Sequence, residues 1–422
     1  MVTSRRGVLA AGLVGGAATL AGCTGAPNQT PPPSIGPTTS GAAPNFNPAD
    51  WESVRAQFRL DPKLAHFAAF VLSPHVTPVA TAIDEHRRQL DADPELALLR
   101  GGELEQQVRI AAAAHSGGQP GDYALTGSTT EGIAIMYGGL SLNSRDEILT
   151  TTHDFYSTEE TLQTVAARTG AAVRRISLYD EPARATVDQM VDAVVRAVSA
   201  RTRVIALTWV HSSTGVRVPV RQIADALGSR RDDLLLCVDG VHGFGASDVA
   251  LPDLGCDFLA TGTHKWLFGP RGTGILYGRD WQPLTALVPT FSARSGAGRL
   301  TPGGYHAFEH QWATAAAFAF HHAIGRDRVA QRTSELAGRL KAGLADAPNV
   351  KVITPAAPEL GGGIVCLDVD GVPGPDAAYR LREAGIACSV TPYATVYLRL
   401  GPSIANNPDQ VDAAVRAITA LA

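Results

Sequence analysis

The chain has 422 residues, of which 45% are hydrophobic and 18% are charged, and its formal net charge is -4. Such a chain can form one large core and a second lobe, and it has no excess of basic residues for binding nucleic acid. Its five cysteines are scattered and form no CxxC pair, so we expect neither a disulfide framework nor a metal site.

The first 23 residues resemble an export signal. Arg5 and Arg6 precede a weakly apolar run over residues 10–21, which is too short for a transmembrane helix. This order is typical of twin-arginine export, and the four residues ending at Cys23 resemble the lipobox of bacterial lipoproteins. We therefore expect a periplasmic location at the cell envelope, with a lipid anchor on Cys23 as the only membrane contact. A disordered tail that happens to contain two arginines is the alternative.

Residues 24–50 are rich in Pro, Thr, Ser and Gly, which predicts a disordered linker. The folded part should begin near Trp51. Helical spacing of apolar residues then predicts helices over 78–90 and 103–114.

A strand over 123–125, a hydroxyl-rich turn and a helix over 133–140 come next. The turn contains Ser128, Thr129 and Thr130. Free backbone N–H groups and the dipole at a helix start favour an anion, and the hydroxyls add donors. A helix cap is the alternative, although one hydroxyl would be enough for that.

A predicted strand over 147–151 leads into a loop that contains His153 and Phe155. Ligands of open parallel sheets bind at the carboxyl ends of strands, so either ring could stack on a flat cofactor there. Ordinary loop packing is an equally good interpretation of this loop alone.

Two further buried strands are predicted over 204–210 and 234–243. The second contains Asp239, followed three residues later by His242. A buried carboxylate needs a partner, and a pyridine nitrogen is one that it would keep protonated. The alternative is a carboxylate that caps nearby backbone N–H groups.

Lys265 lies between two short apolar strands, over 256–260 and 275–277, beside a glycine-rich turn. Burial lowers the pKa of an amine, and a neutral amine can form an imine with an aldehyde such as pyridoxal phosphate. Taken alone, Lys265 is better read as a strand-end lysine that reaches solvent. The surrounding motifs reverse that preference.

The last part of the chain predicts a smaller α/β lobe after a glycine-rich, mobile loop over 291–305. Arg399 stands inside an apolar strand, where it could bind a substrate carboxylate through two hydrogen bonds or form a structural salt bridge. The elements predicted after the loop are helices over 315–324, 329–344 and 409–421 and strands over 350–353, 363–369, 386–390 and 396–400.

Five motifs, at 126–132, 153–157, 211–215, 239–242 and 263–265, resemble in order and spacing the class V aminotransferase fold. This is the branch of fold-type I pyridoxal phosphate enzymes that holds isopenicillin-N-epimerase-like and cysteine-desulfurase-like proteins. The resemblance implies an α/β fold with a mostly parallel, seven-stranded-type sheet, and a homodimer. It implies a large cofactor-binding domain over 51–290 and a small C-terminal α/β domain over 291–422.

The resemblance also implies roles for single residues. Lys265 would hold pyridoxal phosphate as a lysine aldimine, Asp239 would pair with the pyridine nitrogen, and His242 would lie near the phenolic oxygen. Arg399 would bind the substrate carboxylate. Either His153 or Phe155 would lie over the ring. The other expected cofactor contacts are Ser128, Thr129, Thr130, Ser212, Thr263 and His264.

The expected activity is that of a lyase or epimerase acting at the α-carbon of a small-molecule substrate, an amino acid or amino-acid derivative. An aminotransferase and an oxygen-using pyridoxal phosphate oxidase are the alternatives. A binding protein on a retired enzyme fold is disfavoured by the intact Lys265 and Asp239. The segment between Cys388 and Arg399 contains no cysteine, which argues against a persulfide-forming desulfurase. Gln311-Trp312 replaces a pair that, in relatives, reaches the partner subunit's phosphate.

Overall fold

The computed structural model describes residues 46–228, 234–289 and 295–421. The predicted export signal, Cys23 and most of the predicted linker lie outside these ranges. In the described part, no helix is long and apolar enough to cross a membrane.

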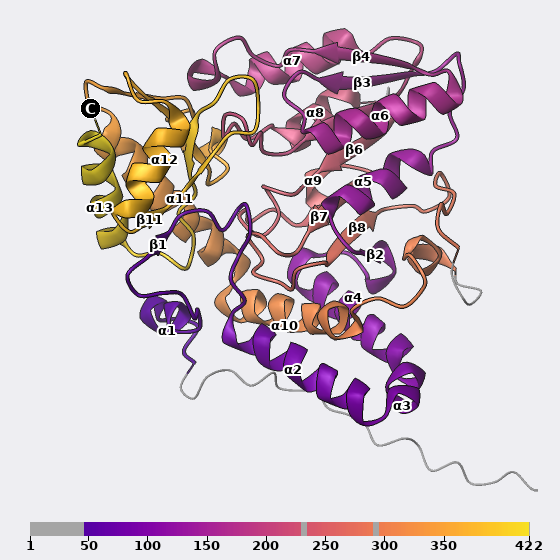
Figure 1. The fold of residues 1–422 in the computed structure, drawn as a ribbon. Helices are drawn as coiled ribbons and strands as arrows, with labels where there is room; N and C mark the ends of the chain where they lie inside the picture. Colours follow the sequence, from indigo (N-terminus) through magenta and orange to yellow (C-terminus); the bar gives the residue numbers. More distant parts are fainter. Residues whose placement is uncertain (1–45, 229–233, 290–294, 422) are drawn as a thin grey trace, which may run out of the picture. The chain divides into compact units, whose positions relative to one another are not determined.

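A seven-stranded sheet forms the centre of the fold (Figure 1). β8 runs antiparallel to both of its neighbours, and all other neighbouring pairs are parallel. The carboxyl ends of every strand except β8 therefore lie at one edge. This confirms the mostly parallel sheet that the sequence predicts. The spatial order is β2 (Tyr123–Thr126), β8 (Gly274–Gly278), β7 (Phe258–Gly262), β6 (Leu235–Asp239), β5 (Thr202–Thr208), β3 (Glu147–Thr151) and β4 (Ala172–Ile176).

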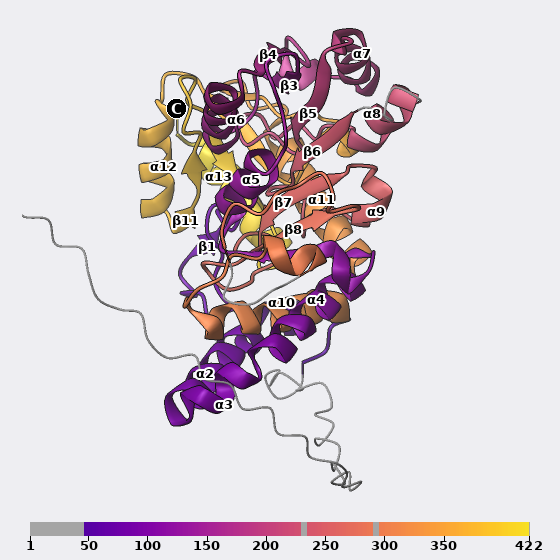
Figure 2. The same cartoon turned by 90° about the vertical axis from the view of Figure 1, so that its right-hand side faces the viewer.

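Helices cover both faces of this sheet (Figures 1 and 2). Successive strand residues such as Ile148 and Leu149 enter different cores, because side chains alternate across a strand. The core on one face includes residues of α5 (Thr129–Gly138) and α6 (Tyr156–Thr169). The other core includes residues of α4 (Gly101–Ser116), α7 (Val187–Ala197), α8 (Val220–Leu227), α9 (Leu251–Leu254) and α10 (Phe308–Ile324).

A second, antiparallel sheet has the order β12 (Ser389–Val390), β13 (Leu398–Leu400), β10 (Val365–Val369) and β9 (Val350–Val352). Its core is completed by α11 (Arg326–Leu344), α12 (Gly374–Glu383) and α13 (Pro408–Thr419). The single strand predicted over 386–390 is in fact two. Its first half, β11 (Ile386–Ala387), pairs with β1 (Ala65–His66), whereas β12 pairs with β13. The domain boundary at residue 290 stays a prediction.

The start of the described chain is already packed before α1 (Trp51–Arg55). Phe46 stacks on Phe320 with the ring centroids 5.3 Å apart, and Arg328 donates hydrogen bonds to the carbonyls of Pro48 and Ala49. The packed chain therefore includes the last residues of the predicted linker. Two further helices follow, α2 (Thr77–Ala92) and α3 (Pro94–Leu99).

Part of the loop predicted to be mobile is instead packed. Residues Gly296–Leu300 form a short 3-10 helix that buries Ala297 and Leu300. The Thr301 hydroxyl accepts a hydrogen bond from the Leu125 backbone N–H at 3.0 Å, which ties this segment to β2.

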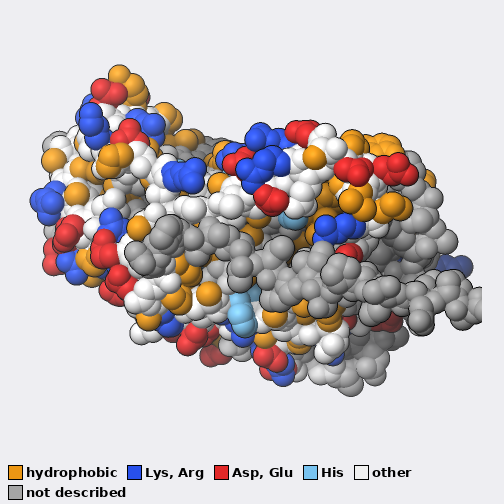
Figure 3. Space-filling view, turned by 90° about the horizontal axis from the view of Figure 1, so that it is seen from below, with side chains coloured by type: hydrophobic (Ala, Val, Ile, Leu, Met, Phe, Trp, Pro, Cys, Tyr) orange, Lys and Arg blue, Asp and Glu red, His pale blue; other side chains and the backbone are white. Residues whose placement is uncertain are grey.

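On the face shown in Figure 3, acidic, basic and hydrophobic side chains of the described residues are interspersed, and these residues form no large area of a single charge.

Candidate active site

The sequence motifs meet at the carboxyl-end edge of the large sheet. Asp239 is the last residue of β6, and Lys265 follows the end of the neighbouring strand β7. Thr208 ends β5 and lies beside Asp239 in the strand register. The carboxyl ends of parallel strands lie at the same edge of the sheet, so residues that are far apart in the sequence become neighbours there.

The turn after Lys265 is held by buried aromatic residues. Phe268 donates its backbone N–H to the Lys265 carbonyl at 3.0 Å, and its φ of 56° lies in the left-handed region, where a bulky residue is strained. Trp266 packs with Phe70 and Ile364 in a small core that joins this turn to the second sheet. This packing fixes the position of the Lys265 backbone, from which the side chain extends.

The pKa of Lys265 is set by two influences that lower it and one that raises it. Burial lowers it, the nearby Arg399 lowers it further, and Asp239 raises it, with the result at about 8. In the part of the chain that the structure describes, the amine makes no hydrogen bond or ion pair. A neutral amine is therefore accessible near neutral pH, as the sequence predicts.

Asp239 is almost completely buried, with 1% of its surface exposed. Its Oδ1 accepts a hydrogen bond from the Val241 backbone N–H at 3.1 Å. Burial raises the pKa of Asp239 to about 6, against the lowering effects of that hydrogen bond and of Lys265. The backbone-capping alternative therefore accounts for one of the two carboxylate oxygens.

Asp154 ties the end of β3 to the end of β5. Its Oδ2 accepts hydrogen bonds from the hydroxyls of Thr150 and Thr151 at 2.7 and 2.8 Å, and its Oδ1 accepts one from Thr208 at 2.7 Å. Burial nevertheless raises the pKa of Asp154. This network holds the loop that contains His153 in place, and no signal in the sequence predicts the network.

Thr129 and His264 form a polar cradle beside Gly262. A Cβ atom on Gly262 would lie 2.8 Å from His264 Cε1 and 3.1 Å from Thr129 Oγ1. Thr129 Oγ1 and His264 Nδ1 are both buried and lack a hydrogen-bond partner in the described residues. A buried polar atom without a partner is costly, so this pair is arranged for a polar ligand such as a phosphate.

The other hydroxyls predicted to bind phosphate have different surroundings. Ser128 is the N-cap of α5, and its Oγ accepts a hydrogen bond from the Glu131 backbone N–H at 3.1 Å. The Thr263 hydroxyl is bonded to the Thr273 hydroxyl, inside the glycine-rich turn. Thr130 is exposed. The helix-cap alternative thus holds for Ser128, and Thr129 is the hydroxyl that is free for a ligand.

Arg399 crosses from β13 of the second sheet toward the site. It donates one hydrogen bond to the Ser212 carbonyl at 3.1 Å, and its guanidinium carbon lies 5.1 Å from the centre of the Phe70 ring. The Nε atom is buried and has no partner in the described residues. It has no carboxylate partner among the ion pairs in these residues, so a salt bridge does not explain its burial. Phe70 also contacts His242, at 6.1 Å between ring centroids.

His242 is fully enclosed, and burial together with Lys265 holds its pKa well below the usual range. It is therefore neutral, and its Nδ1 lacks a partner in the described part of the chain. A neutral imidazole beside the amine can donate or accept a hydrogen bond without adding charge.

The two rings proposed for stacking are in different environments. His153 stacks on Tyr179 at 4.2 Å and on His211 at 4.9 Å, and burial lowers its pKa to about 4. The Tyr179 hydroxyl is hydrogen-bonded to His211 Nδ1 at 2.7 Å, which orders this cluster. Phe155 is instead turned toward Tyr156 and Tyr393.

Three residues of the site were missed by the sequence analysis, namely Phe70, Tyr179 and Tyr393. Ser212, which was predicted, is 2.6 Å from Tyr393 between the two hydroxyl oxygens. Each of the three lies in a loop or turn far from the recognised motifs, and no periodicity marks it. Only the fold brings these rings to the site.

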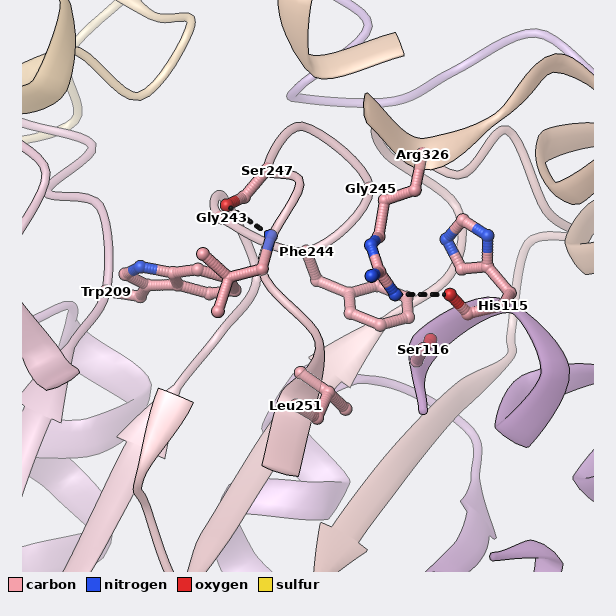
Figure 4. A pocket seen from close by; sticks show the side chains of 10 residues that line it. His115, Ser116, Trp209, Gly243, Phe244, Gly245, Ser247, Leu251 and Arg326 are labelled. Carbon is pink, nitrogen blue, oxygen red and sulfur yellow. Dashed lines mark hydrogen bonds between the residues drawn. The ribbon is translucent and has the colours of Figure 1, made fainter. Parts of the chain in front are cut away.

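A small cavity of about 10 Å³ lies apart from Lys265, under residues 243–251 (Figure 4). It has room for about one water molecule, which is too little for an amino acid. His115 Nδ1 and Ser116 Oγ are buried there without a partner in the described residues, and Arg326 donates to the His115 carbonyl at 2.7 Å. The described residues hold no group of three or more His, Cys, Asp or Glu side chains that could bind a metal ion.

Comparison with known proteins decides the family. The aminotransferase class-V model matches residues 121–413. The chain belongs to the class V aminotransferase family. It is 29% identical over 402 residues to isopenicillin N epimerase of Streptomyces clavuligerus, which covers 88% of this chain and 98% of that protein. It is 29% identical to a probable cysteine desulfurase of Pseudomonas aeruginosa, over 66% of this chain and 70% of that protein.

The fold is also that of solved class V structures. One is a lysine-to-alanine variant of C-DES with glycine covalently linked to its pyridoxal phosphate cofactor. It has a TM-score of 0.79 and 20% identity, and the match covers 87% of this chain and 99% of that chain. The cofactor of this class V aminotransferase is pyridoxal phosphate.

The residues present fit this cofactor. The unpaired atoms of Thr129 and His264 suit its phosphate, Asp239 suits its pyridine nitrogen, and the amine of Lys265 suits its aldehyde. These groups come from the ends of two neighbouring strands, β6 and β7, and from the first turn of the helix that follows β2. This chain therefore has side chains that suit the phosphate of pyridoxal phosphate and others that suit its pyridine ring and aldehyde.

Proposed function

We propose that this protein is a pyridoxal phosphate enzyme that removes a proton from the α-carbon of an amino acid or amino-acid derivative, in a reaction of the epimerase or lyase type. One observation carries the proposal: Lys265, with its pKa lowered to about 8, stands beside Asp239 at adjacent strand ends. The similarity to an isopenicillin N epimerase over nearly its whole length supports it.

When bound, pyridoxal phosphate withdraws electrons from the bond that breaks at the α-carbon. The chain's residues supply the rest. Asp239 would hold the proton on the pyridine nitrogen, Thr129 and His264 would hold the phosphate, and His153 would lie against the ring. Arg399 binds the substrate carboxylate through its free Nε and a terminal nitrogen. The neutral Lys265 amine takes the α-proton and becomes an ammonium.

The cysteines support this assignment over a persulfide-forming reaction. Cys237, Cys256 and Cys366 are buried, and Cys388 is partly buried. Burial raises the pKa of Cys366 and of Cys388 to about 12, so neither is a thiolate at neutral pH. No cysteine lies between Cys388 and Arg399, as the sequence analysis noted.

The test is isotope exchange. Purified protein loaded with pyridoxal phosphate is incubated in deuterated water with a panel of amino acids, and mass and optical rotation are followed. Deuterium at the α-carbon with inversion identifies an epimerase, and release of the side-chain group identifies a lyase. Accumulation of the pyridoxamine form with a keto acid, or release of hydrogen peroxide, would contradict the proposal in favour of an aminotransferase or an oxidase.

We also propose that the chain is exported by the twin-arginine route, lipid-anchored at Cys23 on the periplasmic side, and active as a homodimer. The order of Arg5-Arg6, apolar run and Cys23 in the sequence supports export. A Cys23→Ser variant that stays in the membrane fraction would contradict the anchor, and sedimentation as a single chain would contradict the dimer.

A further inference from the structure

Three aromatic rings from two separate segments form one cluster beside the site. Phe155 and Tyr156 stand at the start of α6, and Tyr393 lies on the loop between β12 and β13. The ring centroids are 5.6 Å apart for Phe155 and Tyr156, 6.2 Å for Phe155 and Tyr393, and 5.5 Å for Tyr156 and Tyr393. Each ring therefore contacts the other two. We call these residues the aromatic triad.

Ser212 links the aromatic triad to Arg399. Its hydroxyl is 2.6 Å from the Tyr393 hydroxyl, and its carbonyl accepts the hydrogen bond from Arg399 at 3.1 Å. One residue thus places the guanidinium and the Tyr393 ring next to each other. Burial raises the pKa of Tyr393 to about 12, so this hydroxyl stays protonated and uncharged at neutral pH.

The aromatic triad keeps apolar surface in contact with solvent. Phe155 is 37% exposed and Tyr156 is 46% exposed, which is high for large rings that already pack on one another. The first loop residue after β3, Thr152, is followed by His153 and Asp154, which are both held in place by the site network. The exposed rings therefore adjoin residues of the site, through Asp154 next to Phe155 in the chain and through the Ser212 contacts with Tyr393 and Arg399.

We propose that the aromatic triad contacts the substrate's side chain and selects amino acids whose side chains are apolar or aromatic. This inference rests on the proposed function, because it takes Arg399 as the carboxylate contact. With the carboxylate held at Arg399, the α-carbon lies beside Ser212 and the side chain extends along the rings. Burial of apolar surface against aromatic rings is favourable, whereas a charged side chain there would lose water without gaining a partner.

The experiment measures binding to the protein loaded with pyridoxal phosphate. Glycine, alanine, leucine, phenylalanine and aspartate are titrated, and apparent Kd values are read from the shift of the cofactor absorption band and from intrinsic fluorescence. The variants are Tyr393→Ala, Tyr393→Phe and Phe155→Ala. Tyr379→Ala is the matched control, because Tyr379 lies on α12 and is 68% exposed.

We expect Tyr393→Ala and Phe155→Ala to raise the Kd of leucine and phenylalanine about tenfold, while the Kd of glycine changes less than about twofold. Tyr393→Phe keeps the ring and loses only the hydrogen bond to Ser212, so it should retain most of the discrimination. Tyr379→Ala should match the unmodified protein.

Equal losses for glycine and phenylalanine would overturn the inference, as would unchanged selectivity or a preference for aspartate. A changed sedimentation coefficient with unchanged selectivity would also overturn it, because the rings would then contact a second copy of the chain. Failure of the proposed function gives a different result: no deuterium enters the α-carbon, or the pyridoxamine form accumulates with a keto acid, whatever the selectivity among side chains.

Discussion

Asp239 ends β6 and Lys265 follows the end of the adjacent parallel strand β7, and burial outweighs their mutual attraction in setting both pKa values. The charge of each stabilises the charged form of the other, yet the pKa of Asp239 rises to about 6 and that of Lys265 falls to about 8. Both neutral forms are therefore accessible near neutral pH. Such perturbed pairs are typical of sites that transfer protons.

The first prediction concerns incorporation of the cofactor. Only the neutral Lys265 amine reacts with an aldehyde, so the rate at which apoprotein takes up pyridoxal phosphate should rise about tenfold between about pH 7 and pH 9. Asp239→Asn removes a group that raises the pKa of Lys265, so the midpoint should move to lower pH. Stopped-flow absorbance measures both. Asp253→Asn on α9 is the control, and a midpoint near 10.5 in the unmodified protein would contradict the prediction.

The second prediction concerns stability of the apoprotein. The pKa of Lys265 is lower in the folded chain than its ordinary value of 10.5. Between these values the unfolded chain binds the proton and the folded chain does not, so the free energy of unfolding should rise with pH from about 8 to about 10.5. Lys265→Met should flatten that rise. Denaturant titrations at a series of pH values test it, and identical slopes for both proteins would refute it.

The third prediction separates two neighbouring hydroxyls. Thr129→Ala should weaken cofactor binding by about tenfold, because it removes one donor to the phosphate, and should leave apoprotein stability unchanged. Ser128→Ala should lower the stability by about 1 kcal/mol through loss of the N-cap of α5. Equilibrium dialysis and thermal unfolding give the two values. The reverse pattern would show that Ser128 is the phosphate ligand.

The fourth prediction concerns the substrate carboxylate. Arg399→Lys replaces a planar fork with a single ammonium, and we expect the KM to rise about 30-fold with a smaller change in kcat. Arg339→Lys on α11 serves as the control, since Arg339 forms an exposed ion pair with Asp412. A fall in kcat with unchanged KM would show that Arg399 does not bind the ground-state carboxylate.

The fifth prediction concerns the Asp154 network. Thr208→Val keeps the shape of the side chain and removes the donor to Asp154 Oδ1, so apoprotein stability should fall by about 1–3 kcal/mol. Thr164→Val, on the outer surface of α6, should have little effect. Equal losses in the two variants would mean that the buried hydrogen bond is not the cause.

The sequence by itself determined the large sheet, most helices and the identity of the cofactor, and it brought the candidate site residues to attention. Asp239 and Lys265 can be recognised from their immediate neighbours in the sequence. A charged residue in or next to an apolar strand is unusual, because burial of a charge is costly. The strands predicted over 147–151 and 275–277 and the helix predicted over 78–90 are found with bounds that differ by no more than two residues.

Only the tertiary structure decided which hydroxyl is left without a partner and which rings lie near Arg399 and Ser212. Ser128 and Thr129 are adjacent and chemically alike, but the helix cap uses one and leaves the other unpaired. Phe70 and Tyr393 reach Arg399 and Ser212 through packing between distant segments, which leaves no periodic trace in the chain. Local patterns record burial and turn chemistry, whereas contacts of high sequence separation depend on how the two sheets pack together.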